Sequence, residues 1–270
     1  MGCQSTKDPK LPNLISSDES SREYHHDMRD ITDSDWNVTM YQGCKNKKQE
    51  IHQITENDET FLRITLDQDS GLGGCPSDPK AGRQRAEVQT KERMIPGNKY
   101  EYSAKVRFNK FVKYQTYFMQ IHSKTGKEGD CYEENGVIST PPVKLQIMEN
   151  MTELFFSPGG WPDPKYQNKI YDVNGLFVVG EWTDVKILID LEIGESLVSL
   201  FLNDTEIFRE YVIGTPNSCI RPWGKIGLFR MPYNIKFYHK WFDTKDPKYG
   251  NKFDSLSVDY DEVHIKRISK

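Results

Sequence analysis

Apolar and polar residues alternate along many short segments of this chain, with the two-residue period that is typical of β-strands. The segment 117–122, Tyr-Phe-Met-Gln-Ile-His, is the most informative. Because successive side chains of a strand point to opposite faces, Gln120 and His122 would share one face while Met119 and Ile121 face a core. The alternating segments are residues 51–55, 60–66, 85–90, 99–108, 115–122, 143–149, 153–156, 182–191, 196–203, 225–230 and 255–268.

Turn signals between these segments complete the prediction of fold class. The Pro-Gly-Asn sequence at 96–98 is one of several that separate strands, and segments 182–191 and 196–203 predict a hairpin. No stretch of ten or more residues has a convincing helical period, and short helices are expected only before Trp36 and near 166–171. Many short strands at this spacing predict an all-β fold, namely a two-sheet antiparallel β-sandwich of the jelly-roll (concanavalin-like) type with a concave substrate cleft.

The amino-acid composition and net charge limit the kinds of molecule that the protein is expected to bind. The chain has 270 residues, of which 28% are charged and 36% hydrophobic, and its net charge is −4. An acidic balance argues against a nucleic-acid binder, although one cleft can still be locally basic. No apolar run reaches the length of about 18 residues that spans a bilayer. We expect one domain over 31–270, preceded by a polar segment, 1–30, that is a disordered tail or a tether.

The first residues, Met1-Gly2-Cys3, suggest a lipid anchor. Gly2 with Thr6 fits a myristoylation pattern, with Cys3 as a palmitoylation site. We favour the interpretation that Cys3 is the lipidated first residue of a mature bacterial lipoprotein. In that case the signal peptide is missing from this sequence, and Met1 and Gly2 are not native. An unmodified tail is the alternative. The five cysteines form no CxxC pair, which argues against zinc, and the four beyond Cys3 could form two disulfides or remain free thiols.

Several strands have one polar face. Alternation places Arg85, Glu87 and Gln89 on one side of the segment 85–90, as it does Gln120 and His122 on theirs. Two more pairs follow the same rule, namely Lys144 with Gln146, and Lys225 with Phe229. If these faces line one cleft, a guanidinium fork, an amide, an imidazole and an ammonium could bind a uronate carboxylate. The alternative is a set of ordinary strand faces in contact with water.

Three of these stretches carry a family resemblance over residues 50–268. They are Arg85-Ala86-Glu87-Val88-Gln89, Gln120-Ile121-His122, and the segment 223–230, Trp-Gly-Lys-Ile-Gly-Leu-Phe-Arg. In order and spacing the chain resembles the jelly-roll polysaccharide lyases: alginate lyases of polysaccharide lyase family seven, glucuronan lyases and heparinase-type lyases. Those families have an Arg-x-Glu strand, a Gln-Ile-His or Gln-Val-His motif, and a late Tyr-Phe-Lys-Ala-Gly-x-Tyr motif.

The resemblance implies β-elimination on a uronic-acid polysaccharide, with no metal required. It implies that Arg85 and Gln120 neutralise the sugar carboxylate, and that His122 takes the C5 proton or assists in that neutralisation. A tyrosine would give a proton to the leaving oxygen, but the matching position here is Phe229. We expect Tyr233 to take this role, with Tyr166 and Tyr171 as other options. Expected substrate contacts are Glu87, Gln89, Lys144, Gln146 and Lys225.

Other functions remain open from the sequence. Glu128, Asp130 and Glu133 match the ExDxxE spacing of laminarinase-like glycoside hydrolases, but the flanking residues read as an exposed loop. Phe229 makes a non-catalytic carbohydrate-binding protein a second alternative. The segment 67–74 faintly resembles a calcium loop and lacks the later bidentate acid, so a plain turn is favoured. We expect a monomer outside the cytoplasm, secreted or attached to a membrane only through Cys3, whose partner is an acidic polysaccharide and not nucleic acid.

Overall fold

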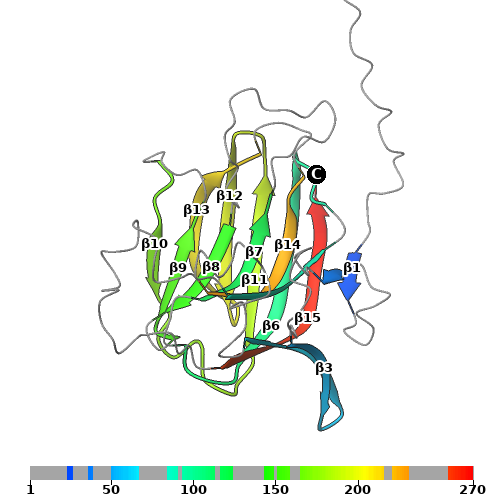
Figure 1. Cartoon of the computed structure of the whole chain (residues 1–270). Helices are drawn as coiled ribbons and strands as arrows, with labels where there is room; N and C mark the ends of the chain where they lie inside the picture. Colours follow the sequence, from blue (N-terminus) through cyan, green and yellow to red (C-terminus); the bar gives the residue numbers. More distant parts are fainter. Residues whose placement is uncertain are drawn as a thin grey trace, which may run out of the picture.

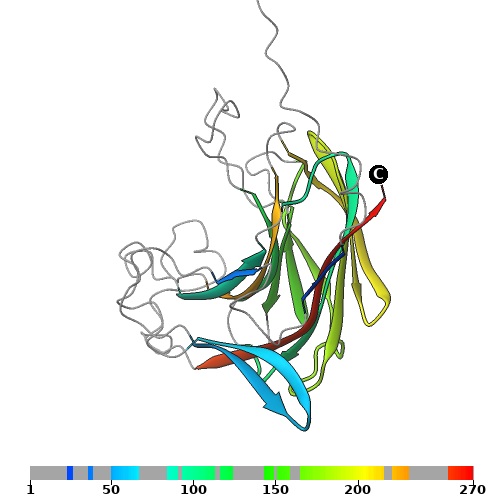
Figure 2. The same cartoon turned by 90° about the vertical axis from the view of Figure 1, so that its right-hand side faces the viewer.

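The computed structural model consists of two antiparallel β-sheets that form two layers (Figures 1 and 2). It describes residues 23–26, 36–38, 50–66, 84–90, 93–112, 116–123, 143–148, 151–158, 165–215, 221–230 and 255–269. For residues 23–26, 36–38, 50, 84, 85, 230 and 269 it describes the backbone only. Within these ranges the regular elements are fifteen strands.

The first sheet, sheet A, has eight strands. In the order of hydrogen-bonded neighbours it comprises β13 (Thr205–Ile213), β12 (Glu195–Leu202), β11 (Thr183–Leu191), β6 (Asn98–Phe108), β15 (Leu256–Ser269), β4 (Glu59–Leu66) and β3 (Glu50–Glu56), while β1 (Glu23–His26) also pairs with β15. The β3–β4 hairpin projects from the lower end of the molecule in both views (Figures 1 and 2).

The second sheet, sheet B, has seven strands. Its order is β10 (Lys169–Asp172), β9 (Glu153–Ser157), β8 (Val143–Met148), β7 (Thr116–His122), β14 (Trp223–Arg230), β5 (Gln84–Thr90) and β2 (Trp36–Val38). Since β14 lies between β5 and β7, three segments that are far apart in the sequence become direct neighbours at the centre of this sheet.

The core fills the space between the two sheets. Alternate residues of β6 and β11 are buried there, as the burial pattern of each strand shows. Sheet B contributes Phe118, whose ring makes edge-to-face contacts with Phe108 and Phe177 at centroid distances of 5.6 and 5.7 Å. Burial of such rings stabilises the fold by about 1.5–3 kcal/mol each. One face of each sheet therefore packs against the other sheet and forms the core.

A β-bulge interrupts the regular alternation where β14 meets β7. The register shifts between Ile226 and Phe229 on β14. Gly227 has a φ of 129°, and a Cβ atom there would collide with the backbone of Ala86 on β5. The Tyr260 hydroxyl reaches the bulge from sheet A, accepts a hydrogen bond from Gly227 N–H at 3.1 Å and donates one to the Phe118 carbonyl at 2.8 Å. A buried residue of one sheet thus satisfies backbone groups that the bulge leaves unpaired in the other.

The structure confirms the predicted two-sheet, all-β fold and each of the predicted strands, including the β11–β12 hairpin. One prediction was wrong, because residues 169–172 form edge strand β10 and not a short helix near 166–171. Strands β1, β2 and β13 were not predicted. Strand β1 lies within the segment 1–30 that was expected to be a tail, and it pairs with β15. Short or charge-rich edge strands give a weak alternation signal.

Candidate active site

A buried carboxylate, Glu87, lies at the centre of the sheet B face that points away from the core. Glu87 Oε1 accepts a hydrogen bond from Gln120 Nε2 at 2.7 Å, and Glu87 Oε2 accepts one from Lys225 Nζ at 2.8 Å. The three residues come from β5, β7 and β14, and are only 3%, 7% and 6% exposed respectively. Charge-assisted hydrogen bonds at this burial fix the orientation of the Gln120 amide and neutralise the charge of Lys225.

His122 stands beside Trp223 on the same face. The two residues are opposite each other in the β7–β14 register, and their rings lie 4.8 Å apart at an interplanar angle of 32°. The Trp223 indole N–H donates to Gln89 Oε1 at 2.9 Å, and the Arg93 guanidinium lies 4.0 Å from the Trp223 ring. The plane of the half-buried imidazole is thereby fixed by an indole that is itself held in place.

Two polar side chains on β8 lack expected partners among the residues that the structure describes. Lys144 is opposite Gln120 in the register, and burial lowers its pKa to about 8. No carboxylate of the described residues forms an ion pair with Lys144, whereas Gln146 is fully buried and its amide has no hydrogen-bond partner among them. An unpaired buried amide costs about 1–3 kcal/mol, so these groups suit a polar, negatively charged ligand.

Tyr117 belongs to this face as well, which simple alternation would not predict. Counting by twos from Met119 places Tyr117 on the core side. The irregular register at residues 117–119 instead sets Tyr117 opposite Gln146 on β8 and Phe229 on β14. Residues that are directly opposite each other in an antiparallel pair share a face. The Tyr117 and Phe229 rings are 5.1 Å apart, so their contact is direct.

We call this set the B face. It consists of the side chains on the outer side of sheet B that have just been described, namely Glu87, Gln89, Tyr117, Gln120, His122, Lys144, Gln146, Trp223, Lys225 and Phe229. Seven of them were proposed from the sequence as site residues, and the structure brings those seven together. Tyr117, Trp223 and Arg93 were not proposed. Trp223 could have been found from its alternation with Lys225, whereas Tyr117 could not.

The remaining sequence candidates are not among the described side chains of the B face. Arg85 is opposite Phe229 in the β5–β14 register, but its side chain is outside what the structure describes, as are Tyr233 and Cys3. Tyr171 does not reach the B face, because it is opposite buried Leu154 and donates a hydrogen bond to Glu210 of sheet A at 2.8 Å. Tyr166 likewise contacts sheet A, through Glu195 at 3.3 Å. The glycoside hydrolase motif at 128–133, the glycine-rich segment at 67–74 and the other four cysteines also fall outside the described residues.

Across the described ranges, no group of three or more His, Cys, Asp or Glu residues is arranged to hold a metal ion. In that same part of the chain, no helix has the length and apolar character needed to cross a membrane.

Known proteins resemble this chain in sequence family and in fold. A family model described as polysaccharide lyase matches residues 29–246, while no curated protein sequence matches. An endo-β-1,4-glucuronan lyase from the fungus Trichoderma reesei superposes with a TM-score of 0.52 at 16% identity, covering 86% of this chain and 94% of that one. A marine family 7 alginate lyase from Zobellia galactanivorans gives 0.54 at 13% identity, covering 83% and 82%.

A third solved structure is that of the family 7 alginate lyase A1-II′ in complex with its substrate, which gives a TM-score of 0.52 at 12% identity, with 83% of this chain and 84% of that one covered. At such identities the solved structures show a shared fold, whereas the family model spans most of the chain. The resemblance predicted from the three motifs is confirmed, and the chain belongs to the polysaccharide lyase family.

Proposed function

We propose that this polysaccharide lyase cleaves a uronic-acid-containing polysaccharide, such as alginate or glucuronan, by β-elimination on the B face. The observation that supports this most is the convergence of Gln120, His122 and Lys144 on one face of sheet B, with the charge of Lys225 already neutralised by Glu87. The substrate carboxylate would be the anion that Lys144 lacks among the described residues.

Binding begins with the uronate carboxylate. Gln120 offers an amide whose orientation is fixed by Glu87, and Lys144 on the adjacent strand offers an ammonium that has no anionic partner among the described residues. The family resemblance gives Arg85, whose backbone is opposite Phe229, the role of a guanidinium fork for the same carboxylate. Withdrawing negative charge from the carboxylate lowers the barrier to removing the proton at C5, because the intermediate that forms is enediolate-like and carries that charge.

Proton transfer then requires a base and an acid. His122 has the residue type suited to take the C5 proton at neutral pH, and Trp223 fixes the plane of its ring. As the C5–H bond breaks, its electron pair forms the C4=C5 double bond, the C4–O bond breaks, and the leaving glycosidic oxygen takes up a proton. In this scheme Glu87 orients Gln120 and Lys225 and does not itself contact the acidic sugar.

The product of elimination provides the test. It contains a C=C bond conjugated with a carboxylate, and therefore absorbs ultraviolet light that the substrate does not absorb. We expect this absorbance to rise when the protein is incubated with alginate, glucuronan or a heparin-type glycan. New reducing ends without the absorbance would instead indicate a glycoside hydrolase. Retention on immobilised polysaccharide without any product would indicate a binding protein, a function compatible with Phe229.

We also propose that the enzyme acts outside the cytoplasm, attached to a membrane through a lipid on Cys3. A polysaccharide is too large to diffuse across a bilayer, so its lyase must meet it on the outer side. Mass spectrometry of the amino-terminal peptide from the native host tests the lipid, and digestion of intact cells by an added protease tests the location. An unmodified Cys3 in a cytoplasmic protein would contradict this.

A further inference from the structure

The family pattern leaves the B face without a tyrosine at the position where one is expected. Phe229 stands there, four residues after Lys225, and its ring has no transferable proton. The elimination nevertheless needs an acid, because an unprotonated glycosidic oxygen is a poor leaving group. If the proposed function holds, another residue of this face must supply that proton.

Tyr117 is the direct neighbour of the position that lacks a hydroxyl. It is opposite Phe229 in the β7–β14 register, and the two rings are 5.1 Å apart with an interplanar angle of 31°. On its other side Tyr117 is opposite Gln146, whose amide has no hydrogen-bond partner among the described residues. The phenol is therefore flanked on both sides by residues of the B face.

The other tyrosines whose side chains are described do not reach this face. Tyr100, Tyr102 and Tyr260 are buried in the core, Tyr211 is 60% exposed on strand β13 of sheet A, and Tyr166 and Tyr171 hydrogen-bond to glutamates of sheet A. Among these side chains, Tyr117 is thus the tyrosine that shares a face with Gln120 and His122.

We propose that Tyr117 is the general acid of this enzyme and replaces the phenol that Phe229 lacks. This rests on the proposed function. As His122 takes the C5 proton and the C4=C5 bond forms, the C4–O bond breaks and the leaving oxygen takes the proton of the Tyr117 hydroxyl. The phenolate regains a proton from water and the imidazolium of His122 loses one to water, so the enzyme returns to its starting state.

The burial of Tyr117 is in keeping with this role. It is 4% exposed, close to the values of 7% for Gln120 and 6% for Lys225. A hydroxyl among residues that largely exclude water interacts more strongly with charge developing on a nearby oxygen than it would in solution. The Phe229 ring, packed against Tyr117, holds the phenol in place.

The test compares wild-type protein with Tyr117→Phe on two uronate substrates. One is alginate or glucuronan, whichever polysaccharide the wild-type protein cleaves. The other is an oligosaccharide of the same uronate that carries 4-nitrophenolate as its leaving group at C4, which departs without protonation. We expect Tyr117→Phe to lose about 10²–10⁴-fold in turnover of the polysaccharide and less than about tenfold on the nitrophenyl substrate. Tyr211→Phe, which changes an exposed tyrosine of sheet A, is the matched control and should keep both rates.

The two-substrate ratio comes from one preparation, so it is independent of how much of the variant is folded. Equal losses on both substrates would show that Tyr117 is structural, and unchanged turnover of the polysaccharide would show that another residue, such as Tyr233, is the acid. Either result overturns the assignment and leaves the proposed function intact. A wild-type protein that forms no unsaturated product on any uronate polymer would remove both.

Discussion

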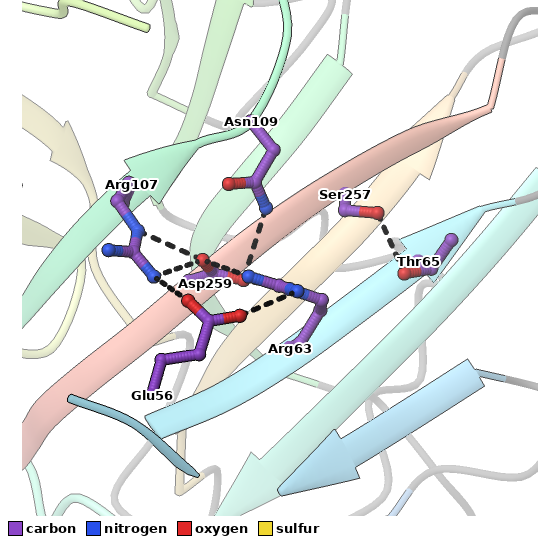
Figure 3. A network of polar contacts seen from close by, with 7 residues as sticks. All are labelled: Glu56, Arg63, Thr65, Arg107, Asn109, Ser257 and Asp259. Atoms are coloured by element: carbon purple, nitrogen blue, oxygen red, sulfur yellow. Dashed lines mark hydrogen bonds and ion pairs between the residues drawn. The ribbon is translucent and has the colours of Figure 1, made fainter. Parts of the chain in front are cut away.

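Each sheet of this protein has a buried carboxylate on its outer face, and the two are surrounded very differently. In sheet A, Asp259 is fully buried and accepts hydrogen bonds from Arg63, Arg107 and Asn109 at 2.7–3.2 Å (Figure 3). Glu56 approaches both arginines, at 3.3 and 3.6 Å, so two cations face two anions. In sheet B, Glu87 accepts one hydrogen bond from Gln120 and one from Lys225.

The difference lies in what each cluster leaves unsatisfied. Around Asp259 the charges balance, and Arg107 also stacks on Phe61 and Trp182 at 4.7 and 4.5 Å. Hydrogen bonding to Asp259 raises the pKa of Arg63, which keeps that charge fixed. Beside Glu87, by contrast, Lys144 has no anionic partner among the described residues and the Gln146 amide has none of any kind there. We infer that the sheet A cluster stabilises the fold and that the B face is organised for a ligand.

The largest expected effect is on turnover when the B face is altered. Gln120→Ala removes the amide that would hold the carboxylate, and His122→Ala removes the base. Each should lower turnover by about 10²–10⁴-fold while the far-ultraviolet circular dichroism spectrum stays unchanged. Arg63→Lys, a change confined to the sheet A cluster, is the control and should keep turnover near that of the wild type. Wild-type rates in both B-face variants would break the comparison.

Replacing each of the two carboxylates by its amide should lower stability in both variants but turnover in only one. Asp259→Asn leaves two arginines without their main anion, and Glu87→Gln does the same for buried Lys225. Each should cost about 3 kcal/mol of unfolding free energy, seen as a fall in melting temperature on the order of 10 °C. Turnover per folded molecule should fall only in Glu87→Gln. An equal fall in turnover for Asp259→Asn would show that sheet A also serves the reaction.

Removing either of two buried tyrosine hydroxyls should have a smaller effect on stability, and the two variants form a well-matched comparison. Tyr260 and Tyr102 are both fully buried, but the Tyr260 hydroxyl bonds to Gly227 and Phe118 whereas the Tyr102 hydroxyl has no partner among the described residues. Denaturant unfolding should show a loss of about 1–3 kcal/mol for Tyr260→Phe and no loss for Tyr102→Phe. Equal losses would mean that the hydroxyl does not support the bulge in sheet B.

The smallest effect concerns pH. Burial lowers the pKa of Lys144 to about 8, so its ammonium loses charge as the pH rises through that value. If Lys144 binds the substrate carboxylate, kcat/KM should fall several-fold above about pH 8, and Lys144→Arg, which stays charged, should lack that fall. A fall that persists in Lys144→Arg would assign it to another group.

The same pKa shift predicts how stability depends on pH. Because the folded state releases the Lys144 proton more readily than the unfolded state, the cost of burying the charge is fully present below about pH 8 and declines as the pH rises toward 10.5, the ordinary value. Over that window wild-type protein should gain unfolding free energy relative to Lys144→Met. A constant difference between the two proteins would contradict the lowered pKa.

The alternation of polar and apolar residues determined how much of the fold and of the candidate site could be predicted from the sequence. It located the central strands and the polar face, because residues such as Gln120 and Lys225 alternate with core residues. It could not locate Tyr117, since the irregular register that turns this residue outward depends on contacts with β8 and β14 that are remote in the sequence. Nor could it separate Asp259 from Glu87, because the partners of a buried carboxylate come from other strands.

The most direct test of the central claim is a crystal structure of the His122→Ala variant, which we expect to be inactive, with an acidic uronate oligosaccharide. We expect a sugar carboxylate within hydrogen-bonding distance of the Gln120 amide and the Lys144 ammonium, and a glycosidic oxygen near the Tyr117 hydroxyl. An oligosaccharide bound instead over the Asp259 cluster of sheet A, with the B face unchanged, would contradict the account.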